Sequence, residues 1–192
     1  MLNRLPWALV VFRLLCAPAL VGLSLIAPQA GGAAAILLSL AVLSDIFDGV
    51  IARRLKVVTP TLRRWDGRAD VIFWLGAALA LWLMHAALAA AVGPLVLILL
   101  VLEVANHAVS FARFRREASP HHWLSKLFCL CLWALFVQLF VSGQASWLLW
   151  LTFGLGVLSQ IEAFAITMRL KAWRCDVPSV FALGRQASAN VI

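Results

Sequence analysis

Four aspartates lie within one short segment of an otherwise strongly apolar chain. They are Asp45, Asp48, Asp66 and Asp70, half of the eight acidic residues in the sequence. The first two are three residues apart and the last two are four apart, so each pair would lie on one face of an α-helix. Carboxylates offer acceptor oxygens only, and these are the ligands that hard divalent ions prefer. The spacing therefore predicts a divalent-metal site made by two neighbouring helices.

The charge of such a cluster limits how it can exist. Carboxylates that share a low-dielectric site repel one another, and each is costly inside a membrane. Positive charge must therefore accompany them. The simplest alternative to a metal site is a solvated loop in which nearby arginines form salt bridges with the aspartates. Two ions, Mg²⁺ or Mn²⁺, would instead clamp a diphosphate and stabilise an in-line displacement at phosphorus. The helical register of the aspartates favours the metal site.

The elements that must position the aspartates are membrane spans. Hydrophobic residues make up 64% of the 192 residues, and the mean hydropathy is +0.98. A soluble domain of this length cannot bury so much apolar surface, so the expected solvent is lipid. Apolar segments long enough to cross a bilayer lie near residues 7–27, 33–52, 68–91, 94–114, 125–142 and 147–168. The predicted fold is all-α, a polytopic membrane protein with a six-helix transmembrane bundle.

The basic residues predict the orientation of these spans. Three short breaks, Pro28–Gly32, Gly93–Pro94 and Ser142–Ser146, contain no lysine or arginine. Of the 16 basic residues, 15 fall on the opposite side, and Arg13 is the exception. By the positive-inside rule that side is cytoplasmic, so both termini are expected there. The net charge of +8 then reflects topology and anionic lipid, and no nucleic-acid-binding motif accompanies it.

Two local signals refine this layout. Arg13 interrupts the first apolar run, so we interpret the run as a retained span and not as a cleaved signal peptide. Thr59 followed by Pro60 predicts an N-cap and a first-turn proline, so the third helix would begin there. The short connection before it would fold the second and third helices into a hairpin. The four carboxylates would then face each other just below the cytoplasmic surface.

The acidic segment resembles the signature of the CDP-alcohol phosphatidyltransferases, D-x-x-D-G-x-x-A-R-x8-G-x-x-x-D-x-x-x-D. Seven of its eight fixed positions agree over 26 residues, and the exception is Leu62, where the family has glycine. The segment reads Asp45-x-x-Asp48-Gly49-x-x-Ala52-Arg53, then eight residues, then Leu62-x-x-x-Asp66-x-x-x-Asp70. The six-span layout extends the resemblance over most of the chain. Residues 1–170 would then form the membrane catalytic domain and residues 171–192 a cytoplasmic or interfacial tail.

The resemblance implies an activity and roles for these residues. Members transfer a phosphoalcohol group, often phosphatidyl, from a CDP-linked donor to the hydroxyl of an acceptor alcohol and release CMP. The implied metal ligands are Asp45, Asp48, Asp66 and Asp70. Asp70 would also be the general base that deprotonates the acceptor. The implied donor-binding residues of the second helix are Gly49, Ala52 and Arg53, and the small residues Gly49 and Ala52 would leave room for the nucleotide. A homodimer is also what the resemblance suggests.

A second, weaker similarity lies upstream of the aspartates. Many members begin their first span with P-N-x-x-T-x-x-R and have a later proline. Pro6, Arg13 and Pro18 match here, whereas Trp7 and Val10 replace the asparagine and the threonine. Arg13 would face the diphosphate of the donor or the acidic cluster. The alternative is a side chain that snorkels to the interface.

The departures from the family pattern fall in the part expected to bind the nucleotide. Trp7, Val10 and Leu62 all replace residues of that part, while the metal ligands are complete. Three interpretations stay open: a donor bound in a modified way, a donor other than CDP-diacylglycerol, and an inactive relative.

Other polar residues suggest where the acceptor binds. Arg113, Arg116 and Lys126 occupy places where the family usually has basic residues of the acceptor pocket, and a small polar alcohol that carries a phosphate would suit these cations. The alternative is that they only set the topology. Within the spans lie Glu103, Asn106, His107 and Glu162, which we interpret as helix-bridging groups. We interpret His122 as a loop residue.

Other functions fit the sequence less well. Membrane prenyltransferases also bind Mg²⁺-diphosphate through aspartates, but they need a second cluster and a longer chain. A divalent-cation transporter needs ionisable groups along a path through the membrane, and here the outer half is nearly free of charge. The expectation is a multi-pass phosphotransferase of phospholipid synthesis in the bacterial inner membrane, with its site at the cytoplasmic side. Its partners would be a CDP-activated lipid donor, an alcohol acceptor and the lipid bilayer.

Overall fold

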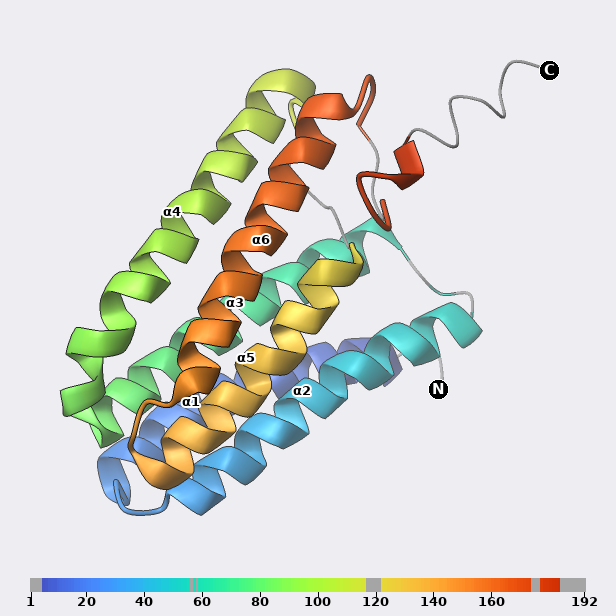
Figure 1. The fold of residues 1–192 in the computed structure, drawn as a ribbon. Helices are drawn as coiled ribbons and strands as arrows, with labels where there is room; N and C mark the ends of the chain where they lie inside the picture. Colours follow the sequence, from blue (N-terminus) through green and yellow to red (C-terminus); the bar gives the residue numbers. More distant parts are fainter. Residues whose placement is uncertain (1–4, 56, 58, 117–121, 174–176, 184–192) are drawn as a thin grey trace. The chain divides into compact units, whose positions relative to one another are not determined.

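A computed structural model describes residues 5–55, 57, 59–116, 122–173 and 177–183, and all regular structure in these ranges is helical (Figure 1). Six of the helices are long and apolar enough to cross a membrane. This confirms the predicted all-α class of a multi-pass membrane protein. In chain order the elements are α1 (Leu5–Ile26), α2 (Gly31–Arg54), α3 (Pro60–Met84), the 3₁₀ turn η2 (Ala86–Leu88), α4 (Ala89–Phe114), α5 (Trp123–Ser142) and α6 (Trp147–Arg169).

One predicted boundary is wrong. Gly93 and Pro94 do not separate the third and fourth spans, because both lie inside α4. Pro94 lies in the second turn of α4, where its missing N–H removes a single hydrogen bond. The chain turns instead at His85, whose backbone (φ −136°, ψ 65°) leaves the helical region. The segment from His85 to Leu88 also lacks lysine and arginine, so the charge asymmetry behind the predicted orientation is unchanged.

The turn at His85 is fixed by a distant part of the chain. The ring nitrogen Nε2 of His85 lies 3.2 Å from the backbone oxygen of Phe140, near the end of α5. Gly31, at the start of α2, approaches the same place so closely that a Cβ there would lie 1.9 Å from that oxygen. The ends of α2, α3 and α5 therefore meet around one carbonyl group.

The chain divides into two compact units. One comprises Met1–Ala89 and Phe136–Gln144, and it contains α1, α2, α3 and the end of α5. The other comprises Ala90–Leu135 and Ala145–Ile192, and it contains most of α4, the start of α5 and α6. All four aspartates of the predicted metal site belong to the first unit. The predicted division into residues 1–170 and a tail of residues 171–192 stays a prediction.

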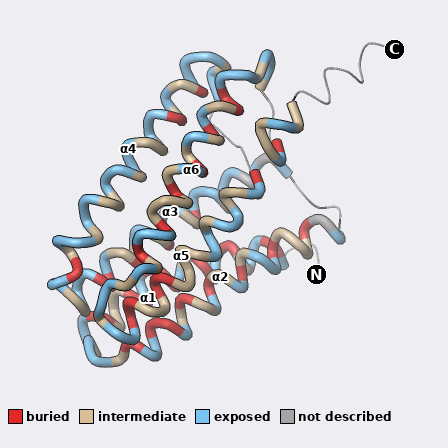
Figure 2. Tube along the Cα trace, viewed as in Figure 1, coloured by how far each residue is buried: buried red, intermediate tan, exposed pale blue. Residues whose placement is uncertain are grey.

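In the first unit, α1 packs against both α2 and α3, which make little contact with each other. Figure 2 shows buried positions recurring along these three helices. The two aspartate pairs, which the sequence predicted to face each other in a hairpin of α2 and α3, therefore meet beside α1, which packs against both helices.

Small residues bring α1 onto α3. A Cβ at Gly76 would lie 2.9 Å from the Cβ of Ala17, closer than side-chain atoms normally come. Ala69, Ala77 and Ala80 of α3 have no exposed surface. In lipid, such close backbone approach through small residues is a main source of helix association. Arg13 lies one turn before Ala17, so this contact carries Arg13 toward α3.

Substitution of Gly76 by leucine should destabilise the first unit, because the added side chain must push α1 away from α3. Overpacking of this kind costs about 1–3 kcal/mol, which thermal unfolding of the detergent-solubilised protein would register as a lower Tm. Gly67→Leu is the matched control, since a Cβ at Gly67 of the same helix meets nothing within 4 Å. Equal Tm values for the two variants would contradict this packing.

Candidate functional site

The two pairs of aspartates are positioned by the end of α2 and the start of α3. The start of α3 is fixed by Thr59, whose extended backbone (φ −120°, ψ 154°) precedes Pro60 and whose hydroxyl accepts the N–H of Leu62 at 3.1 Å. This confirms the predicted cap. Asp66 and Asp70 are four residues apart in the N-terminal half of α3, so both project from one face of it.

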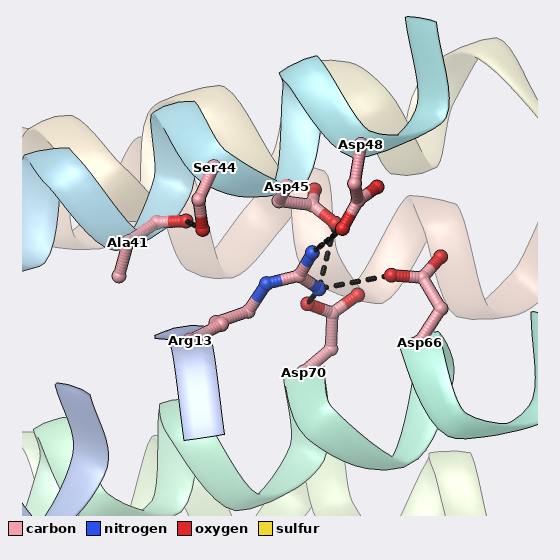
Figure 3. Close-up of polar contacts among 7 residues, drawn as sticks. All are labelled: Arg13, Ala41, Ser44, Asp45, Asp48, Asp66 and Asp70. Atoms are coloured by element: carbon pink, nitrogen blue, oxygen red, sulfur yellow. Dashed lines mark hydrogen bonds and ion pairs between the residues drawn. The ribbon is translucent and has the colours of Figure 1, made fainter. Parts of the chain in front are cut away.

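All four carboxylates converge on the guanidinium group of Arg13 (Figure 3). The Nη1 atom lies 2.7 Å from Oδ1 of Asp45 and 3.1 Å from Oδ1 of Asp66, and it also donates to Oδ1 of Asp70. The Nη2 atom donates to Oδ2 of Asp48. Arg13 thus faces the acidic cluster, one of the two positions predicted for it. With all four carboxylates ionised, the five side chains keep a formal charge of −3.

One edge of this acidic group is buried, and another edge is partly exposed. Arg13 has no exposed surface and the Asp48 side chain keeps only 5% exposure. The side chains of Asp45, Asp66 and Asp70 keep 40%, 31% and 39%. Ser44 beside them donates its hydroxyl to the Ala41 oxygen of its own helix, so it adds no ligand to the group. A bound molecule could therefore reach the carboxylates from the side of the three part-exposed aspartates.

The carboxylates fit a hard divalent ion. Asp45, Asp48 and Asp66 each offer one oxygen, and these three oxygens lie within 4.8 Å of one another. Oxygens bound to one Mg²⁺ at about 2.1 Å lie at most about 4.2 Å apart, so small side-chain rotations would bring the three onto an ion. Asp70 is not one of these three, and its predicted part in metal binding stays a prediction. The set contains oxygen ligands only, which suits Mg²⁺ or Mn²⁺.

Next to the acidic group lies a small apolar cluster. Val10, Ala52, Leu62 and Ala69 are buried together, and Leu14 and Val57 pack against them. Two departures from the family pattern, Val10 and Leu62, therefore share one site with Ala52, a predicted donor-binding residue. Trp7, the third departure, is 37% exposed.

The structure bears on the other predicted donor residues only in part. Gly49 is half-buried in α2, directly after Asp48. Arg53 lies in the last turn of α2, but its side chain falls outside the described residues. Their donor-binding roles stay predictions.

The three predicted acceptor residues make local contacts in the second unit. Arg113 donates to the backbone oxygens of Met168 at 2.7 Å and Leu170 at 3.2 Å, which satisfies the last carbonyl groups of α6. The guanidinium carbon of Arg116 lies 4.9 Å from the ring centre of Trp173, and the Lys126 ammonium lies 4.5 Å from that of Trp123. These contacts support a structural role, and acceptor binding stays a prediction.

Polar side chains bridge α4 and α6, as the sequence suggested for the intramembrane residues. Thr167 donates its hydroxyl to Oδ1 of Asn106 at 3.0 Å, and Gln160 donates to Oε2 of Glu103. His107 instead contacts Glu103 on its own helix, with its Nδ1 atom 3.1 Å from Oε1.

Sequence reasoning missed a buried contact around His122. This residue precedes α5, as predicted for a loop residue, but it is buried, and its Nε2 atom lies 3.1 Å from Oγ of Ser159 and 3.8 Å from Oε2 of Glu162. Glu162 also accepts the N–H of Val180 at 3.2 Å. The same ring nitrogen faces both oxygens, so these three side chains do not form a nucleophile–base–carboxylate relay. The group ties α6 to the segments before α5 and after α6, and no sequence pattern signals it.

The comparison with protein families agrees with the geometry of the acidic group. A model of the CDP-alcohol phosphatidyltransferase family matches residues 3–158, which include Arg13 and all four aspartates. The chain therefore belongs to this family. Its members are CDP-alcohol phosphotransferases that use divalent metals. Searches among curated proteins and among solved structures gave no match.

Replacement of Asp48 by asparagine should weaken metal binding, because it removes one carboxylate ligand from the buried edge of the group. The affinity for Mn²⁺, measured from the electron paramagnetic resonance of the free ion, should fall by about tenfold or more. Glu103→Gln is the matched control, since it removes a carboxylate from a span of the other unit and should leave Mn²⁺ affinity unchanged. Unaltered binding by the Asp48 variant would rule out this metal site.

Proposed function

We propose that the protein transfers a phosphatidyl or similar phosphoalcohol group from a CDP-activated lipid donor to the hydroxyl of a small polar alcohol, with release of CMP. The observation that carries this proposal is the convergence of four carboxylates within the family motif. In the reaction, the acceptor oxygen forms a bond to the donor phosphorus. The bond between that phosphorus and the CMP oxygen breaks, and the acceptor proton passes to the protein.

The residues of the acidic group divide the work. Asp45, Asp48 and Asp66 would hold the ions, with Asp70 contributing to one of them. When bound, the ions supply the charge that clamps the diphosphate and stabilises the leaving CMP. Asp48, at the buried edge of the group, accepts a hydrogen bond from Arg13. Asp70, at the open edge, is proposed as the general base, because its part-exposed carboxylate can reach the hydroxyl of an arriving acceptor.

The apolar cluster favours one variant of this function. A donor nucleotide that lies against Ala52 would have to share that space with Val10 and Leu62, which are 1% and 6% exposed. We infer that the donor binds in a modified way or differs from CDP-diacylglycerol. An inactive relative is the weaker alternative, because the acidic group is complete.

The proposed location of the site rests on the distribution of charge along the sequence. We infer that the acidic group lies at the cytoplasmic side of the membrane, since 15 of 16 basic residues fall on that side of the predicted spans. A bacterial inner membrane stays an expectation. A reporter that matures only in the cytoplasm, fused to either terminus, tests this orientation. The homodimer stays an expectation from the family.

Asp70→Asn should abolish turnover while the fold is kept, because the amide cannot accept the acceptor proton. General-base catalysis contributes about 10²–10⁴-fold, and kcat for CMP release in the presence of Mg²⁺ should fall by that factor. Tm of the same preparation serves as the control for folding. A full rate in a correctly folded variant would show that Asp70 is not the base.

Leu62→Ala should improve the use of CDP-diacylglycerol if Leu62 restricts the space beside Ala52. KM for this donor should fall at a fixed acceptor concentration, with kcat changed less. Leu81→Ala is the matched control, since Leu81 is also a buried leucine of α3 and its loss creates a cavity far along the helix. A KM that is unchanged, or equally changed in both variants, would remove Leu62 from donor selection.

A further inference from the structure

We propose that Arg13 is a resident counter-ion of the acidic group, which holds the four carboxylates together and must leave them when a divalent ion binds. The inference rests on the proposed function, because it assumes that the same aspartates are the metal ligands. It adds a competition between a side chain of this protein and the metal.

The position of Arg13 is the first observation. Its Nη1 atom contacts oxygens of Asp45, Asp66 and Asp70 together, and Nη2 contacts Asp48. Three of these residues offer the oxygens that lie within 4.8 Å of one another. An ion that took the place between Oδ1 of Asp45 and Oδ1 of Asp66 would compete for the oxygens that Nη1 contacts at 2.7 Å and 3.1 Å, and Nη1 carries positive charge of its own. Two cations cannot share that place without strong repulsion, so one must displace the other.

The incomplete hydrogen bonding of Arg13 is the second observation. The guanidinium carries five N–H donors in a fixed planar fork. Among the described residues, its buried Nε atom has no hydrogen-bond partner, although the side chain has no exposed surface. Arginines with a purely structural role normally have such buried donors satisfied. Arg13 is therefore held by attraction to the carboxylates and not by a complete set of hydrogen bonds, which suits a side chain that moves.

The surroundings allow a side-chain movement but not a helix movement. Ala17, one turn beyond Arg13, lies against Gly76 with no room for even a methyl group. The α1 backbone is therefore fixed on α3. The part-exposed side chains of Asp45, Asp66 and Asp70 leave an open edge toward which the guanidinium could turn.

If Arg13 has a purely structural role, its removal should change Mn²⁺ affinity in the opposite direction. If it only positions the carboxylates, its removal scatters them and Mn²⁺ affinity falls. If it competes with the ion, its removal raises Mn²⁺ affinity, because the ion no longer has to displace a bound cation. In both cases the metal-free protein loses stability, since four carboxylates are left without compensation. The sign of the change in affinity separates the two roles.

The test compares wild type with Arg13→Gln, using Mn²⁺ binding by electron paramagnetic resonance and Tm in EDTA. The variant should bind Mn²⁺ about tenfold or more tightly, have a lower Tm in EDTA and gain more Tm from Mn²⁺ than wild type. Arg68→Gln is the matched control, because it removes an exposed cation of α3 whose guanidinium lies 5.7 Å from the Trp65 ring centre. It should leave Mn²⁺ affinity nearly unchanged.

Unchanged or weaker Mn²⁺ binding by Arg13→Gln would overturn the proposal. If Arg13→Gln does not fold, Arg13→Lys is the second test, because lysine keeps the charge but contacts fewer carboxylates at once. The Arg13→Lys variant should bind Mn²⁺ more tightly than wild type. Equal or weaker binding by this variant overturns the proposal. The Asp48→Asn variant distinguishes failure of the counter-ion proposal from failure of the proposed function. If Asp48→Asn binds Mn²⁺ as wild type does, the metal site itself is wrong and both proposals fall.

Discussion

Attraction between one buried guanidinium and four carboxylates organises the first unit of this protein. Arg13 comes from α1, Asp45 and Asp48 from α2, and Asp66 and Asp70 from α3, so the contact joins three helices in one place. Inside a membrane none of these charges is tolerable alone, because each would lose its hydration without a partner. Their mutual compensation is incomplete, with four negative charges facing one positive charge. That surplus of negative charge is what further cations could compensate.

Packing keeps the charged group together. α1 lies on α3 through the close approach of Ala17 to Gly76, and it packs on α2 as well. Immediately beside the carboxylates, Val10, Ala52, Leu62 and Ala69 form an apolar cluster. The same three helices thus place a part-exposed charged group next to a buried apolar cluster. Val10 and Leu62 pack against Ala52, where the resemblance to the family implies that the donor nucleotide lies.

Much of this could be predicted from the sequence because it depends on local rules. Helical spacing paired the aspartates, and Thr59 before Pro60 fixed the start of α3. Several other contacts between distant residues could not be predicted. The turn between the third and fourth spans lies at His85, whose ring contacts the distant Phe140 oxygen. The local Gly93–Pro94 pattern therefore predicted this turn at the wrong position. Val10 and Leu62 were each recognisable as departures from the family, but only the fold shows that they pack together.

The central claim is that the acidic group binds two divalent ions side by side. Electron paramagnetic resonance of the purified protein, titrated with Mn²⁺ from one to two equivalents, tests it most directly. The account predicts a spin-coupled signal from a pair of ions that grows with the second equivalent, because both would share carboxylates of α2 and α3. Two independent, uncoupled Mn²⁺ signals, or no stoichiometric binding, would contradict it.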